Sequence, residues 1–249
     1  MSGCEPIVRT AAILPVKGFP RAKQRLGRSV SDPLRRDLAE AMVSDVLAAL
    51  ARTPGIDRTI VVTGERTAAL AAAALGALVV HDAHERGQSQ AALLGIERAL
   101  AEGAGRVLCV PGDCPALDPA ELGRLLGEGP SPANAHGQTP APELVIIPDR
   151  HGTGTNGLLI TPPGAVDPSF GPGSCERHRA LAAAAGVACR VERPSSLLLD
   201  IDTGADLAQL REVLEREAGR PGFEGRATRT RAVLTRPEHR ASLSPTGRS

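Results

Sequence analysis

Aromatic residues are almost absent from this 249-residue sequence: they make up 1% of it, and there is no Trp and no Tyr. Such a chain has neither an aromatic stacking platform for single-stranded nucleic acid nor an aromatic belt for a membrane interface. A large charge of one sign is also lacking, since the formal net charge is +1. A protein that coats nucleic acid needs a large one-signed field. The composition therefore argues against nucleic acid and membranes as partners and favours a small-molecule substrate.

The sequence has no apolar run long enough to span a bilayer and no early stretch with the pattern of a signal peptide. We therefore expect a cytoplasmic location. The five cysteines are odd in number and form no Cys-x-x-Cys pair, which argues against zinc and against a redox couple. We interpret them as reduced, mostly structural thiols.

Segments of strand and helix character alternate along the chain. Apolar runs predict strands over residues 7–16, 58–63, 77–81 and 106–110. Between them, apolar residues at helical spacing predict helices over residues 32–50, 67–75 and 90–102. This alternation predicts an α/β fold with a mostly parallel sheet covered by helices on both faces, and ligands that gather beyond the carboxyl ends of the strands.

The second half continues the pattern with more polar loops. We expect a short helix from Asp118, with Glu121 bonding back to its cap, then a surface loop over residues 127–142. Strands follow at 143–148, 157–161 and 189–193, with a helix over 174–185. Thr203 and Asp206 open a last helix to about residue 217. Residues 220–249 are rich in Arg, Pro, Gly, Ser and Thr without apolar periodicity, which predicts a disordered basic tail after one domain of residues 1–219.

A cluster of cations follows the first strand. It contains Lys17, Arg21, Lys23 and Arg25, and it suits the charge of a nucleoside triphosphate. The loop lacks the glycine pattern of a dinucleotide site and the ending of a P-loop, which disfavours a dehydrogenase or a P-loop kinase. A solvated basic loop explains this motif alone equally well.

Three aspartates are candidate ligands of a hard cation. Asp113 directly follows a predicted buried strand, and the alternate spacing of Asp200 and Asp202 in an extended segment points both carboxylates to one side. Such like charges repel unless a cation lies between them, and Mg²⁺ prefers carboxylate oxygens. Asp202 or Thr203 also suits a helix cap, so capping and metal binding both remain open for this segment.

Two glycine-rich turns offer room for an anionic ligand. Residues 148–157 contain Thr153, Thr155 and Asn156 as neutral donors, and Ser174 follows the glycines of residues 171–173 at the start of a helix. Either segment by itself also fits an ordinary turn. His151 and His178 are set aside as acid–base groups, because a phosphate oxygen needs orientation rather than deprotonation.

Together these motifs resemble those of the phosphoenolpyruvate/2-phospho-L-lactate guanylyltransferases of coenzyme F-420 biosynthesis, over about residues 11–207. The resemblance is carried by Pro15-Val16-Lys17 with Ala22-Lys23-x-Arg25-Leu26, by residues 148–156, by Phe170-Gly171-x-Gly173-Ser174 with His178, and by Asp200-x-Asp202-Thr203. The chain departs from the usual family pattern at Gly112-Asp113-Cys114-Pro115 and at Gly87-Gln88-Ser89.

The resemblance implies a three-layer nucleotidyltransferase fold of the GT-A or molybdopterin guanylyltransferase type, with residues 1–219 as the catalytic domain. It implies transfer of the guanylyl group of GTP to phosphoenolpyruvate, with 2-phospho-L-lactate or 3-phosphoglycerate as alternative acceptors and the next enzyme of the pathway as a candidate partner. A non-catalytic GTP-binding regulator is the rival hypothesis. The expected catalytic residues are Lys17, Lys23 and Asp113; Mg²⁺ is expected on Asp113, Asp200 and Asp202, the acceptor on Thr155, Gly171 and Ser174, and the nucleotide on Lys17, Arg21, Lys23, Arg25, Gly87 and Ser89.

Overall fold

The computed structural model describes residues 9–127, 141–220 and 223–237, and every side chain in them except that of Arg21. Most of the predicted loop at 127–142 therefore lies outside the described residues. Within them, seven strands form one sheet in the order β3-β2-β1-β4-β6-β5-β7. Only β6 runs against the other strands of this sheet. The strands are β1 (Thr10–Val16), β2 (Arg58–Thr63), β3 (Leu78–His81), β4 (Arg106–Cys109), β5 (Glu143–Pro148), β6 (Thr155–Thr161) and β7 (Ala188–Val191).

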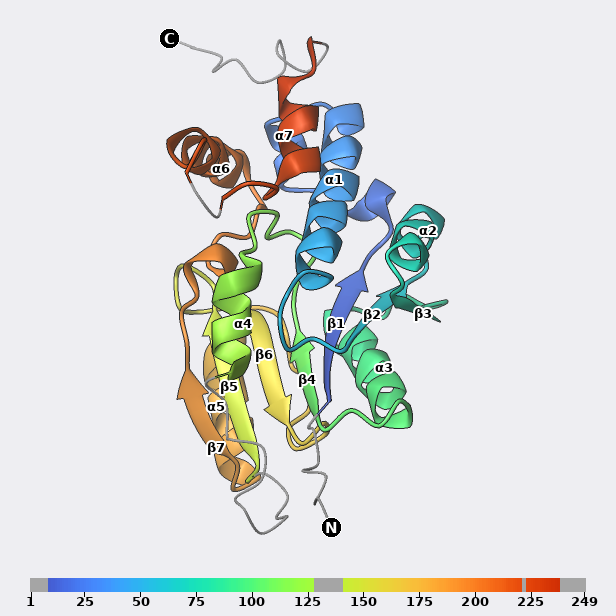
Figure 1. Ribbon diagram of the computed structural model, residues 1–249, viewed down its shortest axis with the longest axis vertical. Coiled ribbons are helices and arrows are strands. Elements are labelled where there is room, and N and C mark those ends of the chain that lie inside the picture. The colour runs from blue at the N-terminus through green and yellow to red at the C-terminus, as the bar shows by residue number, and fades with distance from the viewer. Residues whose placement is uncertain (1–8, 128–140, 221–222, 238–249) are drawn as a thin grey trace, which may run out of the picture.

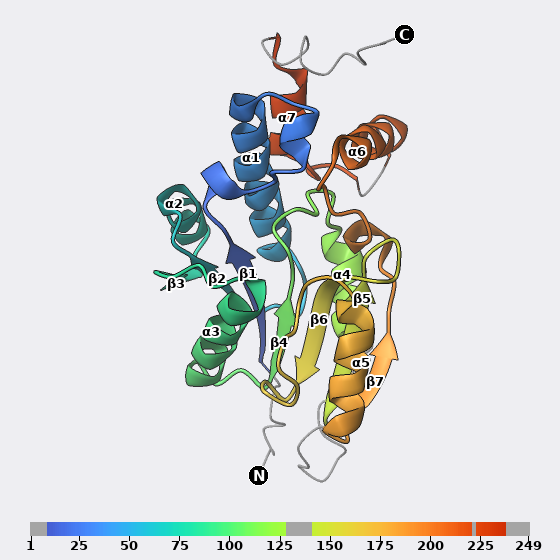
Figure 2. The ribbon, with the colours of Figure 1, turned by 180° about the vertical axis from the view of Figure 1, so that it is seen from behind.

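Helices cover both faces of the sheet, as Figures 1 and 2 show. The helices α1 (Asp32–Leu50), α2 (Arg66–Ala74) and α4 (Pro119–Gly127) share one apolar core with one face of the strands. On the opposite face, α3 (Gln88–Ala101) and α5 (Ser174–Ala184) share a second core. The three-layer α/β architecture predicted from the alternation of elements is thus confirmed.

A third core lies beyond the carboxyl ends of the parallel strands. It joins the first half of α1 to α6 (Gly204–Arg216) and α7 (Thr228–Thr235), the helices at the top of Figure 1. Leu34, Leu38 and Leu210 are fully buried there. Short 3-10 turns, Phe19–Arg21 and Leu26–Arg28, lie in the loop between β1 and α1. The loop that carries the predicted triphosphate cations is therefore packed between the sheet and this third core.

The prediction that residues 220–249 form a disordered tail is wrong for residues 223–237. Phe223, Val233 and Leu234 are buried in the third core, and α7 packs on α1. The carboxylate of Asp45 on α1 accepts hydrogen bonds from the backbone N–H groups of Arg229 (2.9 Å) and Thr230 (2.8 Å). A carboxylate distant in the sequence thus caps α7. The residues next to this helix contain no capping motif from which it could be predicted. Residues 238–249 lie outside the described residues.

The expected capping bond of Glu121 is also wrong. Its carboxylate accepts hydrogen bonds from the backbone N–H groups of Ser195 (2.7 Å) and Ser196 (2.9 Å), and so holds the 3-10 turn Ser195–Leu197 against α4. In the described part of the chain, none of the helices is long and apolar enough to cross a membrane.

Candidate active site

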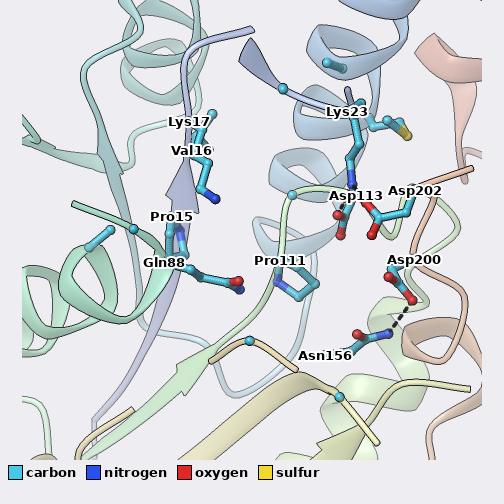
Figure 3. Close-up of a pocket in the computed structure, with 18 of the residues that line it drawn as sticks. Pro15, Val16, Lys17, Lys23, Gln88, Pro111, Asp113, Asn156, Asp200 and Asp202 are labelled. Atoms are coloured by element: carbon cyan, nitrogen blue, oxygen red, sulfur yellow. Dashed lines mark hydrogen bonds and ion pairs between the residues drawn. The ribbon is translucent and has the colours of Figure 1, made fainter. Parts of the chain in front are cut away.

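A cavity of about 670 Å³ opens at the carboxyl edge of the sheet (Figure 3). Because β6 runs against its neighbours, its first residues reach the same edge as the last residues of β1 and β4. Segments remote in the sequence therefore line one space. Among the residues that line it are Lys17, Lys23, Arg25, Gly87, Asp113, Thr155, Gly171, Ser174, Asp200 and Asp202.

The ammonium group of Lys23 lies between two of the predicted metal ligands. Its Nζ donates to Asp113 Oδ2 and, at 2.8 Å, to Asp202 Oδ1, while the exposed Arg25 pairs with the second oxygen of Asp202. Lys23 adopts φ 56°, a left-handed backbone conformation that is costly for a residue with a side chain. The strained backbone and the two ion pairs together fix the direction of this lysine into the cavity.

The charges of this cluster shift one another's pKa values. Burial alone would lower the pKa of Lys23, but the carboxylates of Asp113 and Asp202 outweigh burial and raise it. For Asp202, burial opposes ionisation, yet Lys23 and Arg25 hold its pKa below the usual value. Burial and the nearby charge of Asp113 raise the pKa of Asp200, which has no lysine partner. Asp200 is thus the carboxylate of the three that most needs a further cation.

Backbone contacts explain why these aspartates converge. The N–H of Ile201 donates to the carbonyl oxygen of Asp113 at 3.0 Å, which ties the segment before α6 to the loop after β4. Asn156 Nδ2 donates to Asp200 Oδ1 (3.3 Å) and to the carbonyl oxygen of Leu197 (2.7 Å). The backbone of Asp113 and the carboxylate of Asp200 are therefore both held by neighbouring segments of the chain.

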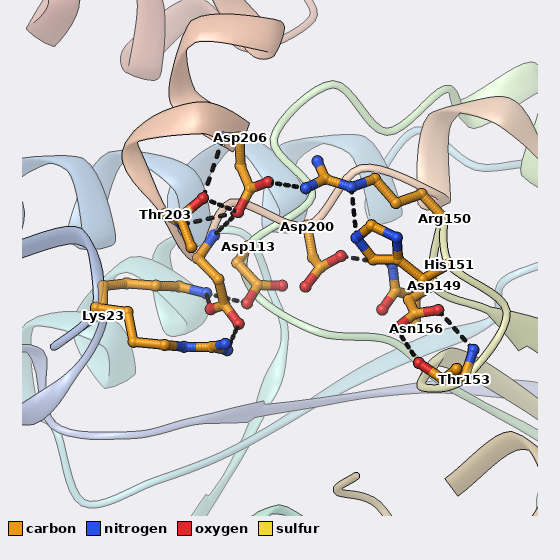
Figure 4. A network of polar contacts seen from close by, with 12 residues as sticks. Lys23, Asp113, Asp149, Arg150, His151, Thr153, Asn156, Asp200, Thr203 and Asp206 are labelled. Atoms are coloured by element: carbon orange, nitrogen blue, oxygen red, sulfur yellow. Dashed lines mark hydrogen bonds and ion pairs between the residues drawn. The ribbon is translucent and has the colours of Figure 1, made fainter. Parts of the chain in front are cut away.

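The start of α6, where Thr203 and Asp206 lie (Figure 4), also positions Asp202. Thr203 and Asp206 form the predicted capping box, and Asp206 Oδ2 also accepts a hydrogen bond from the N–H of Asp202 at 3.0 Å. Arg150 pairs with the other oxygen of Asp206 and links this helix to the glycine-rich turn after β5. Capping is thus done by Thr203 and Asp206, which leaves the side chain of Asp202 directed into the cavity.

The carboxylate cluster fits a hard cation such as Mg²⁺. Asp113 Oδ1 is buried and has no hydrogen-bond partner among the described residues, so one ligand atom is available. In the same part of the chain, no three acidic, histidine or cysteine side chains, Asp113, Asp200 and Asp202 included, are grouped so that they could hold a metal ion by themselves. Mg²⁺ does not require such a cage, because it commonly takes one or two carboxylates together with phosphate oxygens and water.

Polar groups of the glycine-rich turns form the opposite wall. Ser174 Oγ lies 3.0 Å from Thr155 Oγ1, and Gly171 has φ 119°, a conformation that favours glycine. Ser174 opens α5, and the first two N–H groups of this helix are already used: that of Ser174 donates to the carbonyl oxygen of Gly171 (3.1 Å) and that of Cys175 to the carbonyl oxygen of Thr153 (3.2 Å). This wall therefore offers the hydroxyls of Thr155 and Ser174 to an anion, while Asp149 of the same glycine-rich turn also lines the cavity.

Only some of the other residues predicted to contact the nucleotide line the cavity. Lys17 and Gly87 line the cavity, whereas Ser89 is not among its lining residues and instead accepts a hydrogen bond from the N–H of Phe170 at 2.9 Å. The side chain of Arg21 lies outside what the structure describes. Sequence reasoning missed Asp82 and Gln88, which line the cavity after β3; only their place after a parallel strand marked them.

Two acidic residues brace the basic loop and were also missed. Glu85 accepts a hydrogen bond from the N–H of Gly18 (3.2 Å), and Glu65 accepts one from the N–H of Phe19 (3.3 Å). They hold the backbone that presents Lys17 to the cavity.

Fold and site together define a nucleotidyltransferase-type protein: a three-layer α/β sheet with lysines and carboxylates at one edge. A solved structure from Desulfovibrio desulfuricans G20, whose name proposes a nucleotide-diphospho-sugar transferase, is similar with a TM-score of 0.67 and 18% identity, covering 94% of this chain and 96% of that one. A nucleotidyl transferase from Methanothermobacter is similar with a TM-score of 0.58 and 21% identity, covering 84% and 98%. At these identities the likeness shows the fold.

The chain belongs to the family described as "Guanylyl transferase CofC like", which it matches over residues 10–215. A relative from Conexibacter woesei is 47% identical over 84% of this chain and 91% of its own length; a relative from Rubrobacter xylanophilus is 41% identical over 80% and 92%. Both are named phosphoenolpyruvate guanylyltransferase. The family resemblance predicted from the motifs is confirmed.

Proposed function

We propose that this protein transfers the guanylyl group of GTP to phosphoenolpyruvate, giving enolpyruvyl-2-diphospho-5'-guanosine and pyrophosphate. The names of the relatives from Conexibacter and Rubrobacter support this donor and acceptor. The observation that carries the proposal is one cavity that is lined both by the cations and carboxylates of the charge cluster and by the hydroxyls of Thr155 and Ser174. Such a lining suits a triphosphate beside a smaller phosphorylated acid.

In the proposed reaction, a phosphate oxygen of phosphoenolpyruvate forms a bond to the α-phosphorus of GTP. The bond from that phosphorus to the oxygen bridging to the β-phosphate breaks, and pyrophosphate leaves with the electron pair. No general base is required, because the attacking phosphate oxygen is already ionised at neutral pH. Orientation and charge neutralisation are therefore the main tasks of the protein.

Each wall of the cavity has its part in this proposal. Lys17, Lys23 and Arg25 neutralise the triphosphate and the departing pyrophosphate. Thr155, Gly171 and Ser174 bind and orient the acceptor. Asp113, Asp200 and Asp202 would hold Mg²⁺, which supplies polarisation of the phosphoryl oxygens and alignment of donor and acceptor.

The proposal includes a cytoplasmic location, because GTP and phosphoenolpyruvate are metabolites of that compartment. It also includes delivery of the diphosphate product to the next enzyme of coenzyme F-420 biosynthesis.

The test supplies the purified protein with Mg²⁺, GTP and one acceptor at a time: phosphoenolpyruvate, 2-phospho-L-lactate or 3-phosphoglycerate. Pyrophosphate release gives the rate, and the mass of the product identifies the bond formed. We expect the highest kcat/KM with phosphoenolpyruvate and little turnover when ATP or CTP replaces GTP. Faster turnover of another acceptor would replace the proposed substrate, and GTP binding without turnover of any acceptor would favour a regulator.

A further inference from the structure

His178 lies behind the acceptor wall of the cavity. It is on α5, its side chain is fully buried, and it is not among the residues that line the cavity. Its Nδ1 lies 3.1 Å from Thr155 Oγ1, and its Nε2 lies 2.8 Å from the backbone nitrogen of Ser169. The ring therefore contacts one of the two hydroxyls that face the cavity but cannot itself touch a ligand there.

The backbone of Ser169 determines which ring nitrogen carries the proton. A backbone N–H can only donate, so Nε2 must be the unprotonated nitrogen that accepts this bond. A neutral imidazole carries its proton on the other nitrogen, so Nδ1–H donates to Thr155 Oγ1. Burial and the nearby Arg177 lower the pKa of His178 to about 4, which keeps the ring neutral at neutral pH.

The surroundings hold this arrangement in place. Arg177 donates from Nε to Ser169 Oγ (2.9 Å) and from one terminal nitrogen to the carbonyl oxygen of Ser169 (2.8 Å). The ring of Phe170 packs edge-on against the imidazole, with the ring centroids 5.5 Å apart. The N–H of Ser169 and the plane of the ring are thus both fixed.

A count of protons shows what this tautomer does. Ser174 Oγ and Thr155 Oγ1 are 3.0 Å apart and share one hydrogen bond, which uses one of their two hydroxyl protons. Because His178 already donates to Thr155, the second hydroxyl proton remains for a ligand in the cavity. If Nδ1 accepted instead, His178 and the shared bond would use both protons, and only lone pairs would face the cavity. An anionic acceptor needs the donor.

We propose that His178 is a positioning residue that sets the direction of the Thr155–Ser174 hydroxyl pair, so that the pair presents one O–H donor to the anionic acceptor. This inference rests on the proposed function, in which that acceptor is phosphoenolpyruvate. His178 acts through Thr155 and takes no part in proton transfer.

The first test determines which ring nitrogen of His178 carries the proton in the unliganded wild-type protein. Nitrogen-15 NMR of protein labelled at the histidine rings distinguishes a protonated ring nitrogen from an unprotonated one, with loss of one signal set in H178N as the assignment. We expect the proton on Nδ1 and none on Nε2 at neutral pH. A proton on Nε2 would overturn the inference.

The second test compares two amide substitutions that mimic different ring nitrogens. Asn places its amide where Nδ1 lies and can still donate to Thr155, whereas Gln places its amide near Nε2 and leaves Thr155 without that donor. Because Thr155 then lacks the bond that fixes the direction of its hydroxyl, the remaining O–H is no longer held toward the cavity, and we expect H178Q to raise the KM for phosphoenolpyruvate by about tenfold, with the KM for GTP unchanged. H178N should stay within about threefold of wild type.

Equal effects of H178N and H178Q on the acceptor, or an equal rise in the KM for GTP, would show a merely structural role. A double variant adds a further check: in a T155V background, which lacks the hydroxyl, H178Q should have little additional effect on the acceptor KM. Additive losses would overturn the inference.

Failure of the proposed function can be distinguished from failure of the inference about His178. If wild-type protein does not bind phosphoenolpyruvate, the proposed function fails, and the acceptor role of His178 falls with it. If wild-type protein binds phosphoenolpyruvate but carries the ring proton on Nε2, only the inference about His178 fails.

Discussion

At the scale of single residues, Lys23 is the link between the two halves of the charge cluster. It joins Asp113 after β4 to Asp202 before α6, which are 89 positions apart in the numbering of the printed sequence. Its charge offsets the repulsion of carboxylates that would otherwise be brought together in a partly buried place. A triphosphate with Mg²⁺ would bring both signs of charge to the same point, so the cluster is suited to exchange partners when substrate binds.

Replacement of Asp113 by Asn should remove activity and leave the fold intact. The amide is neutral and of the same size, so it removes the negative charge that we propose to bind Mg²⁺ while filling the same space. We expect kcat to fall by about 100-fold or more, as measured by pyrophosphate release. The matched control is D167N, at an exposed aspartate that does not line the cavity. Full activity of D113N would remove this carboxylate from the mechanism.

His178 should make the protein less stable in mild acid. Its pKa is about 4 in the folded protein against 6.5 for the ordinary side chain, so between these values the unfolded chain binds a proton that the folded chain does not. The contribution of neutral His178 to the free energy of unfolding is therefore fully present above pH 6.5. It is lost as the pH drops toward 4, which lowers the free energy of unfolding by about 3 kcal/mol in total. Urea unfolding of wild type and H178N across this range measures the difference in slope. Parallel slopes would contradict the assigned pKa.

Several site residues could be predicted from the sequence because position on a parallel sheet determines where they lie. Asp113 lies in the loop that follows β4, and the spacing of Asp200 and Asp202 puts both carboxylates on one side. The contact of Ser89 with Phe170 and the contact of His178 with Thr155 could not be predicted, because each joins segments whose relative placement depends on tertiary packing.

At the scale of elements, α7 shows what periodicity cannot detect. The helix has few apolar residues, and its buried face includes the hydroxyl-bearing Thr230. Its N-terminal N–H groups are satisfied by Asp45 from α1, so neither its start nor its core contacts are encoded locally. Helix α1 and the capping box of α6 were predictable because their signals are local: apolar residues recur every four positions from Leu34 to Leu50, and Thr203 and Asp206 lie three positions apart.

Removal of the distant cap should destabilise the third core. We expect D45A to lower the free energy of unfolding by about 1–2 kcal/mol, because one buried and one partly buried N–H group of α7 lose their acceptor. The control is D37A, also on α1, which breaks an exposed ion pair with Arg236 and should cost less than about 0.5 kcal/mol. Chemical denaturation of both variants provides the comparison. Equal losses would show that Asp45 does not act as a cap.

At the scale of the whole molecule, the order and direction of the strands bring the site residues together. The crossover from β1 through α1, the loop after β4 and the reversed β6 all deliver polar residues to one edge of the sheet, and α6 and α7 close the end beyond it. Alternation of strands and helices was enough to predict this edge. The reversal of β6 and the packing of α7 depend on long-range pairing and had to come from the structure.

The central claim is that one cavity joins the phosphate of phosphoenolpyruvate to the α-phosphorus of GTP. The most direct measurement uses phosphoenolpyruvate labelled with oxygen-18 at the three non-bridging phosphate oxygens, followed by mass spectrometry of both products. The account predicts that all three labels stay in the guanosine diphosphate ester and that pyrophosphate carries none. Label in pyrophosphate, or no labelled ester at all, would contradict it.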